Sequence, residues 1–196
     1  MEPVILASSS PRRQEILKML KIPFRVIIPN IDESCHDKVD IEQIPEVIAK
    51  QKVAAVIKSL PVGQEIPWIL GADTIISLDG NLMGKPQNHE QAAEYLKKLQ
   101  GRTHTVITAI VLYNGKTHES TSRVCKTKVA FARMTDEEIN WYVETGEWHG
   151  AAGGYRIQSL ASCFIRKIEG SYSCVIGLPI YELYDILKGQ GYSILE

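Results

Sequence analysis

The stretch Trp68–Leu78 (WILGADTIISL) constrains the fold most, because it is a long apolar run broken by one carboxylate. Apolar runs rich in β-branched residues are typical of strands that are covered on both faces. The turn-forming residues Asp79-Gly80-Asn81 follow it directly. The sequence therefore predicts a central strand of a sheet that is flanked by helices.

Shorter strand-like and helical segments alternate on either side of this run. We expect strands at Val4–Ala7, Phe24–Ile28, Tyr155–Gln158 and Cys163–Ile168, and a long antiparallel hairpin formed by Thr103–Tyr113 and Thr121–Arg133. We expect helices from Ser10-Pro11, over Ile44–Ser59, from Asn88 to Gly101, from Thr135 to about Gly146, and from Pro179 to Gly189. Because a hairpin cannot be parallel, the fold class is α/β with a mixed sheet. No linker marks a boundary, so we expect a single domain over residues 1–196.

The composition excludes several classes of protein. The chain has 196 residues, 44% of them hydrophobic, so it can bury a core without disulfides, and it is not a disordered protein. With 22 Lys and Arg against 23 Asp and Glu, it carries no net charge that would attract nucleic acid or an anionic membrane. The N-terminal residues lack the pattern of a signal peptide, so we expect none, and no apolar run approaches the roughly 20 residues that span a bilayer. None of the four cysteines, Cys35, Cys125, Cys163 and Cys174, forms a CxxC pair, so we expect them to be reduced thiols. Together with the charge and the hydropathy, this predicts a cytoplasmic protein without nucleic-acid or membrane partners.

The segment Ser8-Ser9-Ser10-Pro11-Arg12-Arg13 is a candidate phosphate site. It joins a predicted strand to a helix N-terminus, where backbone N–H groups and the helix dipole favour an anion. Arg12 and Arg13 add guanidinium donors. In the first helical turn their positive charges oppose the helix dipole, so they lower the stability of the helix unless an anion is bound there. The alternative is a plain serine cap with two solvated arginines, and the residues alone favour neither interpretation.

Asp73 is a candidate catalytic or metal-binding carboxylate. An unpaired charge inside an apolar run is costly to bury, so it needs a cation, a metal or a cleft. The alternative is a carboxylate bonded to backbone amides at a bulge near Gly71. The residues favour a functional role for Asp73. Asp32-Glu33 could share a hard cation with it, although an acidic pair in a loop is more often a solvated turn.

Other polar residues suit a polyphosphate or a base. Lys50, Lys52 and Lys85 could each bind phosphate, although each taken singly is typical of a surface lysine. Gln158 ends a glycine-rich segment and could read a base edge, the alternative being an amide bonded to backbone at a strand end. The chain has no Walker A, GxSxG or HExxH motif, and the histidines form no pattern, so we assign them to surface or structure. Direct attack by water is the simplest phosphate chemistry for such a set.

Six motifs, taken in this order, resemble those of the Maf family of nucleoside triphosphate pyrophosphatases over nearly the whole chain. They are Leu6-Ala7-Ser8-Ser9-Ser10-Pro11-Arg12-Arg13, Gly71-Ala72-Asp73-Thr74, Gly84-Lys85-Pro86, Gly101-Arg102-Thr103-His104, Gly153-Gly154-Tyr155-Arg156-Ile157-Gln158 and Gly177-Leu178-Pro179. The resemblance implies an elongated, twisted mixed sheet flanked by helices, similar to inosine triphosphate pyrophosphatases, with a cleft between two lobes and often a homodimer. It also implies a house-cleaning hydrolase that converts a nucleoside triphosphate to the monophosphate and pyrophosphate with Mg²⁺, or alternatively Mn²⁺.

Matched position by position, the resemblance assigns roles to individual residues. Asp73 would be the proton acceptor and, with Glu33, would hold the metal. The phosphates would be bound by Ser8, Arg13, Lys52 and Lys85. The base would be selected by Arg12, Thr74 and Gln158, a combination similar to the branch that prefers dTTP and UTP and that could also take modified pyrimidine nucleotides. Ser159 departs from the pattern, since many relatives have glycine after the Ile-Gln pair.

Two alternative functions stay open at this point. Family members have been linked to the inhibition of septum formation in bacterial division, so the chain could be a nucleotide-binding regulator. It could also be a pyrophosphatase specific for 7-methyl-GTP or purines. The polar set around Asp73 favours an enzyme, because a pure binding protein would not need it.

Overall fold

The computed structural model describes residues 1–33, 39–61 and 68–195, which form two compact units. The first unit comprises Met1–Asp73, Thr108–Cys125 and Gly177–Glu196, and the second comprises Thr74–Ile107 and Lys126–Ile176. Three long strands pass from one unit into the other, and the boundary on the central strand falls between Asp73 and Thr74. Each unit is described below by itself.

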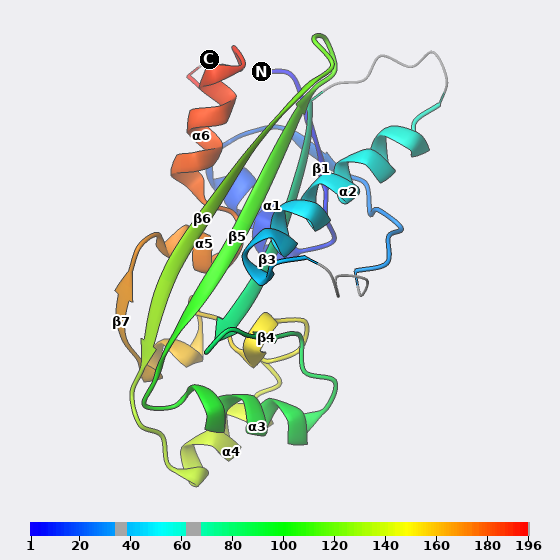
Figure 1. The fold of residues 1–196 in the computed structure, drawn as a ribbon. Helices are drawn as coiled ribbons and strands as arrows, with labels where there is room; N and C mark the ends of the chain where they lie inside the picture. Colours follow the sequence, from blue (N-terminus) through cyan, green and yellow to red (C-terminus); the bar gives the residue numbers. More distant parts are fainter. Residues whose placement is uncertain (34–38, 62–67, 196) are drawn as a thin grey trace. The chain divides into compact units, whose positions relative to one another are not determined.

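The strands form one seven-stranded mixed sheet of order β2-β1-β3-β5-β6-β7, with β4 paired to β3 (Figure 1). Their bounds are β1 (Val4–Ala7), β2 (Phe24–Val26), β3 (Trp68–Leu78), β4 (Asn81–Met83), β5 (Thr103–Asn114), β6 (Glu119–Phe131) and β7 (Ile165–Glu169). β1 pairs in parallel with β2 and β3, whereas β4 is antiparallel to β3 and β7 to β6. Figure 1 also shows β5 and β6 as a long hairpin. The expected α/β class with a mixed sheet is confirmed.

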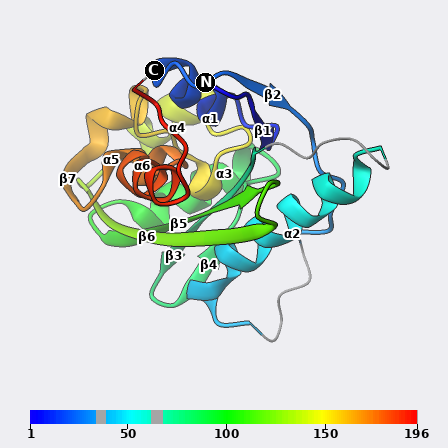
Figure 2. The same ribbon diagram turned by 90° about the horizontal axis from the view of Figure 1, so that it is seen from above.

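In the first unit, helices cover both faces of the strands. The helices are α1 (Pro11–Met19), α2 (Ile44–Ser59), preceded by the short 3-10 turn η1 (Ile41–Gln43), and α6 (Ile180–Gly189). Figure 2 shows α2 on one face and α1 and α6 on the other. Apolar side chains of α2 pack on β1, β3 and β5 in a buried cluster that includes Ala49, Val53, Val56, Ile5, Ala7, Ile69 and Val111. Strands that are buried on both faces explain the continuous apolar runs of the sequence.

Gly71 allows α2 to lie unusually close to β3. A Cβ atom built on Gly71 would lie 2.6 Å from the carbonyl oxygen of Ala49 and 2.7 Å from Cγ2 of Val53. Any side chain at this position would therefore force the helix away from the strand. Gly71 and Asp73 are two residues apart on β3, so they face the same side of the sheet.

The second unit has its own apolar core. Its helices are α3 (His89–Leu99), α4 (Asp136–Glu144) and the short α5 (Tyr172–Ile176), and its 3-10 turns are η2 (Ala152–Gly154) and η3 (Leu160–Phe164). Phe131, Tyr142, Trp148 and Tyr155 are among the buried residues of this core. The predicted caps are present: Asn88 accepts a hydrogen bond from the N–H of Gln91, and Thr135 and Glu138 form a full capping box.

Three predicted elements need correction. Tyr155–Gln158 is not a strand, because Gly153 and Gly154 adopt positive φ angles of 65° and 75° and lead the chain into a turn. The strand predicted at Cys163–Ile168 begins only at Ile165, because η3 precedes it. Ser10 occupies the predicted N-cap of α1, but its side chain makes no capping hydrogen bond. The sequence did not predict β4, α5 or the 3-10 turns, which are too short to show a period. Within the part of the chain that the structure describes, no helix has the length and apolar character needed to cross a membrane.

His104 on β5 is a buried titratable group of the second unit. Its Nε2 lies 2.7 Å from the hydroxyl of Tyr155, and its ring lies against Phe131 and Tyr155. Burial lowers the pKa of His104 to about 4. The neutral ring is therefore the form that the folded state stabilises.

We expect the stability of the protein to fall as the pH drops from about 6.5 to about 4. The unfolded chain takes up a proton on His104 near its ordinary pKa, which the folded chain does not, so acid favours unfolding by about 2 kcal/mol between pH 7 and pH 5. His104→Gln removes this titrating group. Its free energy of unfolding, measured in urea, should therefore fall by about 2 kcal/mol less between pH 7 and pH 5 than that of the wild type. His89→Gln, at an exposed position on α3, is the control and should behave as the wild type. An equal pH dependence for His104→Gln and the wild type would contradict a neutral buried ring.

Candidate active site

The ammonium group of Lys52 on α2 binds two carboxylates in the first unit. Its Nζ lies 2.7 Å from Oδ1 of Asp73 on β3 and 2.8 Å from Oε1 of Glu33, in the segment after β2. It also lies 3.5 Å from the carbonyl oxygen of Ala72. Lys52 and Asp73 are buried, at 6% and 7% exposure, whereas Glu33 is exposed. Asp73 thus has the cationic partner that its place in an apolar run requires.

The approach of α2 to Gly71 explains why Lys52 reaches Asp73. Lys52 lies on the same face of α2 as Ala49 and Val53, which contact the strand at Gly71. Asp73 follows Gly71 by two residues and faces the same helix. The missing side chain at Gly71 therefore sets the distance across which the ammonium and the carboxylate meet.

Arg13 on α1 is the second buried cation of the first unit. Its Nε donates a hydrogen bond of 2.8 Å to the carbonyl oxygen of Gly177, and its Nη1 donates one of 2.9 Å to the hydroxyl of Ser8. Burial lowers the pKa of Arg13, and the negative charges of Asp73 and Glu33 act in the opposite direction. A guanidinium keeps its charge even so. Arg13 is therefore held in one orientation, within the field of the carboxylates that bind Lys52.

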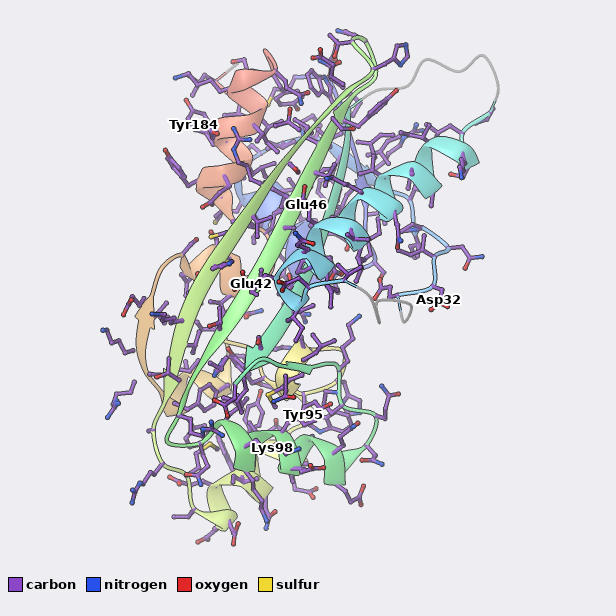
Figure 3. The ribbon with its side chains drawn as sticks, in the orientation of Figure 1. Asp32, Glu42, Glu46, Tyr95, Lys98 and Tyr184 are labelled. Carbon is purple, nitrogen blue, oxygen red and sulfur yellow. The ribbon has the colours of Figure 1, made fainter. Side chains whose placement is uncertain are left out.

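The structure distinguishes Lys50 from Lys52, and Asp32 from Glu33, by their burial and contacts. Lys50 is an exposed residue that forms an ion pair of 2.6 Å with Glu46 one turn earlier on α2, so here the surface interpretation is correct. Lys52 is buried in the carboxylate cluster instead. Asp32, on the segment that follows β2 (Figure 3), is exposed, and its neighbour Glu33 is the member of the pair that contacts Lys52.

Six of the nine predicted site residues belong to the first unit and three to the second. The first unit holds Ser8, Arg12, Arg13, Glu33, Lys52 and Asp73, and the second holds Thr74, Lys85 and Gln158. Arg12 is half-buried in the first turn of α1, next to Arg13. Thr74 is half-buried on β3, whereas Lys85 and Gln158 are exposed. Asp73 and Thr74 are consecutive residues of one strand, at the boundary between the units.

Within the second unit, the segment around Lys85 packs against the glycine-rich segment that leads to Gln158. The N–H of Gly153 donates a hydrogen bond of 2.9 Å to the carbonyl oxygen of Gly84. A Cβ atom on Gly154 would lie 3.3 Å from Cγ of Pro86. Two motifs that are far apart in the sequence are thus neighbours through their backbones.

The carboxylates of Asp73 and Glu33 fit a divalent cation. Both bind one ammonium, so the two contacting oxygens lie within two hydrogen-bond lengths of each other. Carboxylate oxygens are the ligands that Mg²⁺ prefers, and it is often held by one or two of them together with phosphate oxygens. In the described ranges no group of three or more His, Cys, Asp or Glu is placed to bind a metal. A cation here would take its remaining ligands from water and from the oxygens of a phosphate ligand.

The fold has a counterpart among solved structures. The Ham1 protein of Staphylococcus aureus matches 96% of this chain and 100% of its own length, with a TM-score of 0.56 and 14% sequence identity. At that identity the match defines the fold alone. The chain therefore has the α/β fold of the Ham1 protein.

The sequence comparisons define the family. A model of the family described as Maf-like protein matches residues 3–190. A protein of Pelotomaculum thermopropionicum is 40% identical over 195 residues, covering 100% of both chains. A protein of Escherichia coli O157:H7 is 42% identical over 192 residues, covering 96% of this chain and 93% of its own. Both relatives are named dTTP/UTP pyrophosphatase. The chain belongs to the Maf family, and the expected resemblance is confirmed.

We predict that Lys52→Met destabilises the protein by about 3 kcal/mol, because it leaves the buried Asp73 carboxylate without its cation. The matched control is Lys50→Met on the same helix, which removes an exposed ion pair and should cost no more than about 0.5 kcal/mol. Urea unfolding of both variants at pH 7 measures the difference. Equal stability of the two variants would show that Lys52 is not required to compensate Asp73.

Proposed function

We propose that this protein is a nucleoside triphosphate pyrophosphatase that hydrolyses dTTP and UTP, and modified pyrimidine nucleotides, to the monophosphate and pyrophosphate. The observation that carries the proposal is the cluster that the buried Lys52 and Asp73 form with the exposed Glu33. It lies in a chain that aligns from end to end with proteins named dTTP/UTP pyrophosphatase. Such a cluster combines a base, two metal-binding carboxylates and a cation for phosphate.

The charge balance of the cluster favours a metal-bound triphosphate as its ligand. Among the described residues of this cluster, the charges of the two cations Arg13 and Lys52 are balanced by those of the two carboxylates Asp73 and Glu33. A triphosphate carries several negative charges and needs further cations. A divalent ion on Asp73 and Glu33 would supply positive charge and polarise the phosphate oxygens.

Asp73 is the residue best suited to activate the attacking water. Its carboxylate lies on β3, beside the ammonium of Lys52, and in this proposal it accepts the proton that water loses as it attacks phosphorus. Glu33 shares the ammonium with it and completes the pair of carboxylates. Asp73→Asn keeps the shape of the side chain but removes the base.

The cations stabilise the charge that moves onto the leaving pyrophosphate. Arg13 is fixed by the carbonyl of Gly177 and the hydroxyl of Ser8, so its guanidinium needs little reorganisation. Lys52 would donate to phosphate oxygens if a divalent ion took its place on the carboxylates. Lys85, exposed after β4, adds a further cation for the phosphates.

The base is selected by Arg12, Thr74 and Gln158 in this proposal. Thr74 directly follows the catalytic Asp73 on β3. Gln158 presents an exposed amide, which both donates and accepts hydrogen bonds and so suits a pyrimidine edge.

The proposal predicts metal-dependent release of pyrophosphate from dTTP and UTP that is lost in Asp73→Asn. The measurement is a panel of dTTP, UTP, CTP, 7-methyl-GTP, ITP and GTP, each with Mg²⁺ and with EDTA. Loss of a general base lowers the rate by roughly 10² to 10⁴-fold, while the circular dichroism spectrum should stay unchanged. Asp79→Asn is the matched control: Asp79 is exposed in the turn after β3, and asparagine tolerates its positive φ of 51°.

Two outcomes of this panel would overturn parts of the proposal. A preference for 7-methyl-GTP or purines would keep the chemistry but reject the roles of Thr74 and Gln158. No turnover of any nucleotide by the folded protein would reject the enzyme and favour a nucleotide-binding regulator of cell division.

We also predict that Gln158→Ala lowers the ratio of kcat/KM for UTP to kcat/KM for CTP by roughly tenfold. Without the amide, the protein loses the hydrogen bonds that distinguish the edge of uracil from that of cytosine. The ratio of kcat/KM values for the two substrates measures this. Gln87→Ala removes an exposed glutamine in the same unit and should leave the ratio unchanged. An unchanged ratio in Gln158→Ala would show that Gln158 does not read the base.

A further inference from the structure

The five-residue segment 156–160, with Gln158 at its centre, is held at both ends by two residues of one neighbouring segment. At the start, the backbone N–H of Arg156 donates a hydrogen bond of 3.3 Å to the hydroxyl of Tyr142 on α4. At the end, the backbone N–H of Leu160 donates one of 3.1 Å to Oε2 of Glu147. The hydroxyl of Ser159 also donates to Oε1 of Glu147.

Tyr142 and Glu147 lie five residues apart in one continuous segment, at the end of α4 and just after it. The hydroxyl of Tyr142 accepts from Arg156, and the carboxylate of Glu147 accepts from Ser159 and Leu160. Together with the backbone from Tyr142 to Glu147, these hydrogen bonds form a closed ring around the turn that carries Gln158.

The turn itself is pinned to the core below the ring. Ile157 is buried in the core of the second unit, while its neighbour Gln158 is exposed. The N–H of Ser159 donates to the carbonyl of Arg156, which closes a tight turn with Gln158 at its third position. The hydrogen bonds of the neighbouring residues and the buried side chain of Ile157 therefore fix the turn, and this limits the positions that the Gln158 side chain can reach.

Glu147 is presented by a rigid segment. The next residue, Trp148, is 3% exposed, and its Nε1 donates a hydrogen bond of 3.0 Å to the carbonyl of Val143 at the end of α4. A charged acceptor on such a segment makes stronger hydrogen bonds than a neutral one.

Ser159 contributes to the ring without straining the backbone. Its φ is −130°, which any residue adopts, so the position does not require the glycine of many relatives. The hydroxyl that replaces glycine here gives Glu147 a second contact. The residue that departs from the family pattern therefore adds a hydrogen bond that holds this turn.

We propose that Glu147, with Tyr142, is the positioning residue that holds Gln158 in the orientation that selects the base. The inference rests on the proposed function, because it concerns the amide that is assigned to base choice there. Glu147 acts on the turn that carries Gln158, through Ser159 and Leu160, so its loss changes substrate preference and KM more than kcat.

The test compares Glu147→Ala, Glu147→Gln and Tyr142→Phe with the wild type, with Glu137→Ala as control. Glu137 is an exposed acidic residue in the first turn of α4. Two readouts are used: steady-state kinetics with UTP and CTP, and hydrogen exchange of the peptide that contains residues 156–160. Exchange reports the ring directly, whatever the substrate.

We expect Glu147→Ala to speed exchange in this peptide at least tenfold, to raise KM for UTP roughly tenfold and to narrow the preference over CTP as Gln158→Ala does, with kcat within about threefold. Glu147→Gln keeps an acceptor and should recover most of the preference. Tyr142→Phe opens one end of the ring and should give a smaller effect in the same direction.

Each failure has its own signature. Unchanged exchange in Glu147→Ala would overturn the ring as a constraint on the turn. Faster exchange with wild-type KM and preference would show that the ring is structural and does not position the amide. A wild type that hydrolyses no nucleotide would instead overturn the proposed function, and the inference about base choice with it.

Discussion

The ion pair between the Lys52 ammonium and the Asp73 carboxylate is the interaction on which the rest of the site depends. Both groups are buried, and neither charge could be kept there alone. The pair brings Glu33 to the same ammonium and places two carboxylates within reach of one cation. The same arrangement that satisfies a buried charge in the folded chain also prepares a site for a metal and a triphosphate.

The fold builds this pair from a helix and a strand that could not meet without Gly71. The side chain that Gly71 lacks would collide with the backbone of α2 at Ala49, which lies one turn before Lys52. Gly71 is therefore required in its motif for packing, because it lets α2 lie close enough to β3 for the buried ion pair to form. The guanidinium of Arg13 is fixed by the hydroxyl of Ser8 and the carbonyl of Gly177. Segments near the start and the end of the chain thus both bind this buried cation.

The sequence predicted the elements whose local pattern is strong and missed those that long-range contacts determine. The bounds of Trp68–Leu78 and Ile44–Ser59 are confirmed, because an apolar run and a helical period are local signals. The burial of Lys52 could also have been read from its spacing to Ala49 and Val53. Its pairing with Glu33 could not, since it joins segments of unrelated pattern. The strand predicted at the end of the glycine-rich segment was wrong, because glycine spacing alone does not reveal positive φ. Glu147 had no signal beyond its place in that segment.

A crystal structure with Mn²⁺ and the α,β-methylene analogue of UTP, in which anomalous scattering locates the metal, would test the role of this ion pair most directly. We expect a metal peak at the carboxylates of Asp73 and Glu33, with phosphate oxygens completing its coordination and the Lys52 ammonium on the phosphates. A triphosphate bound elsewhere, with Lys52 still bound to both carboxylates, would contradict the claim that this buried ion pair is the catalytic centre.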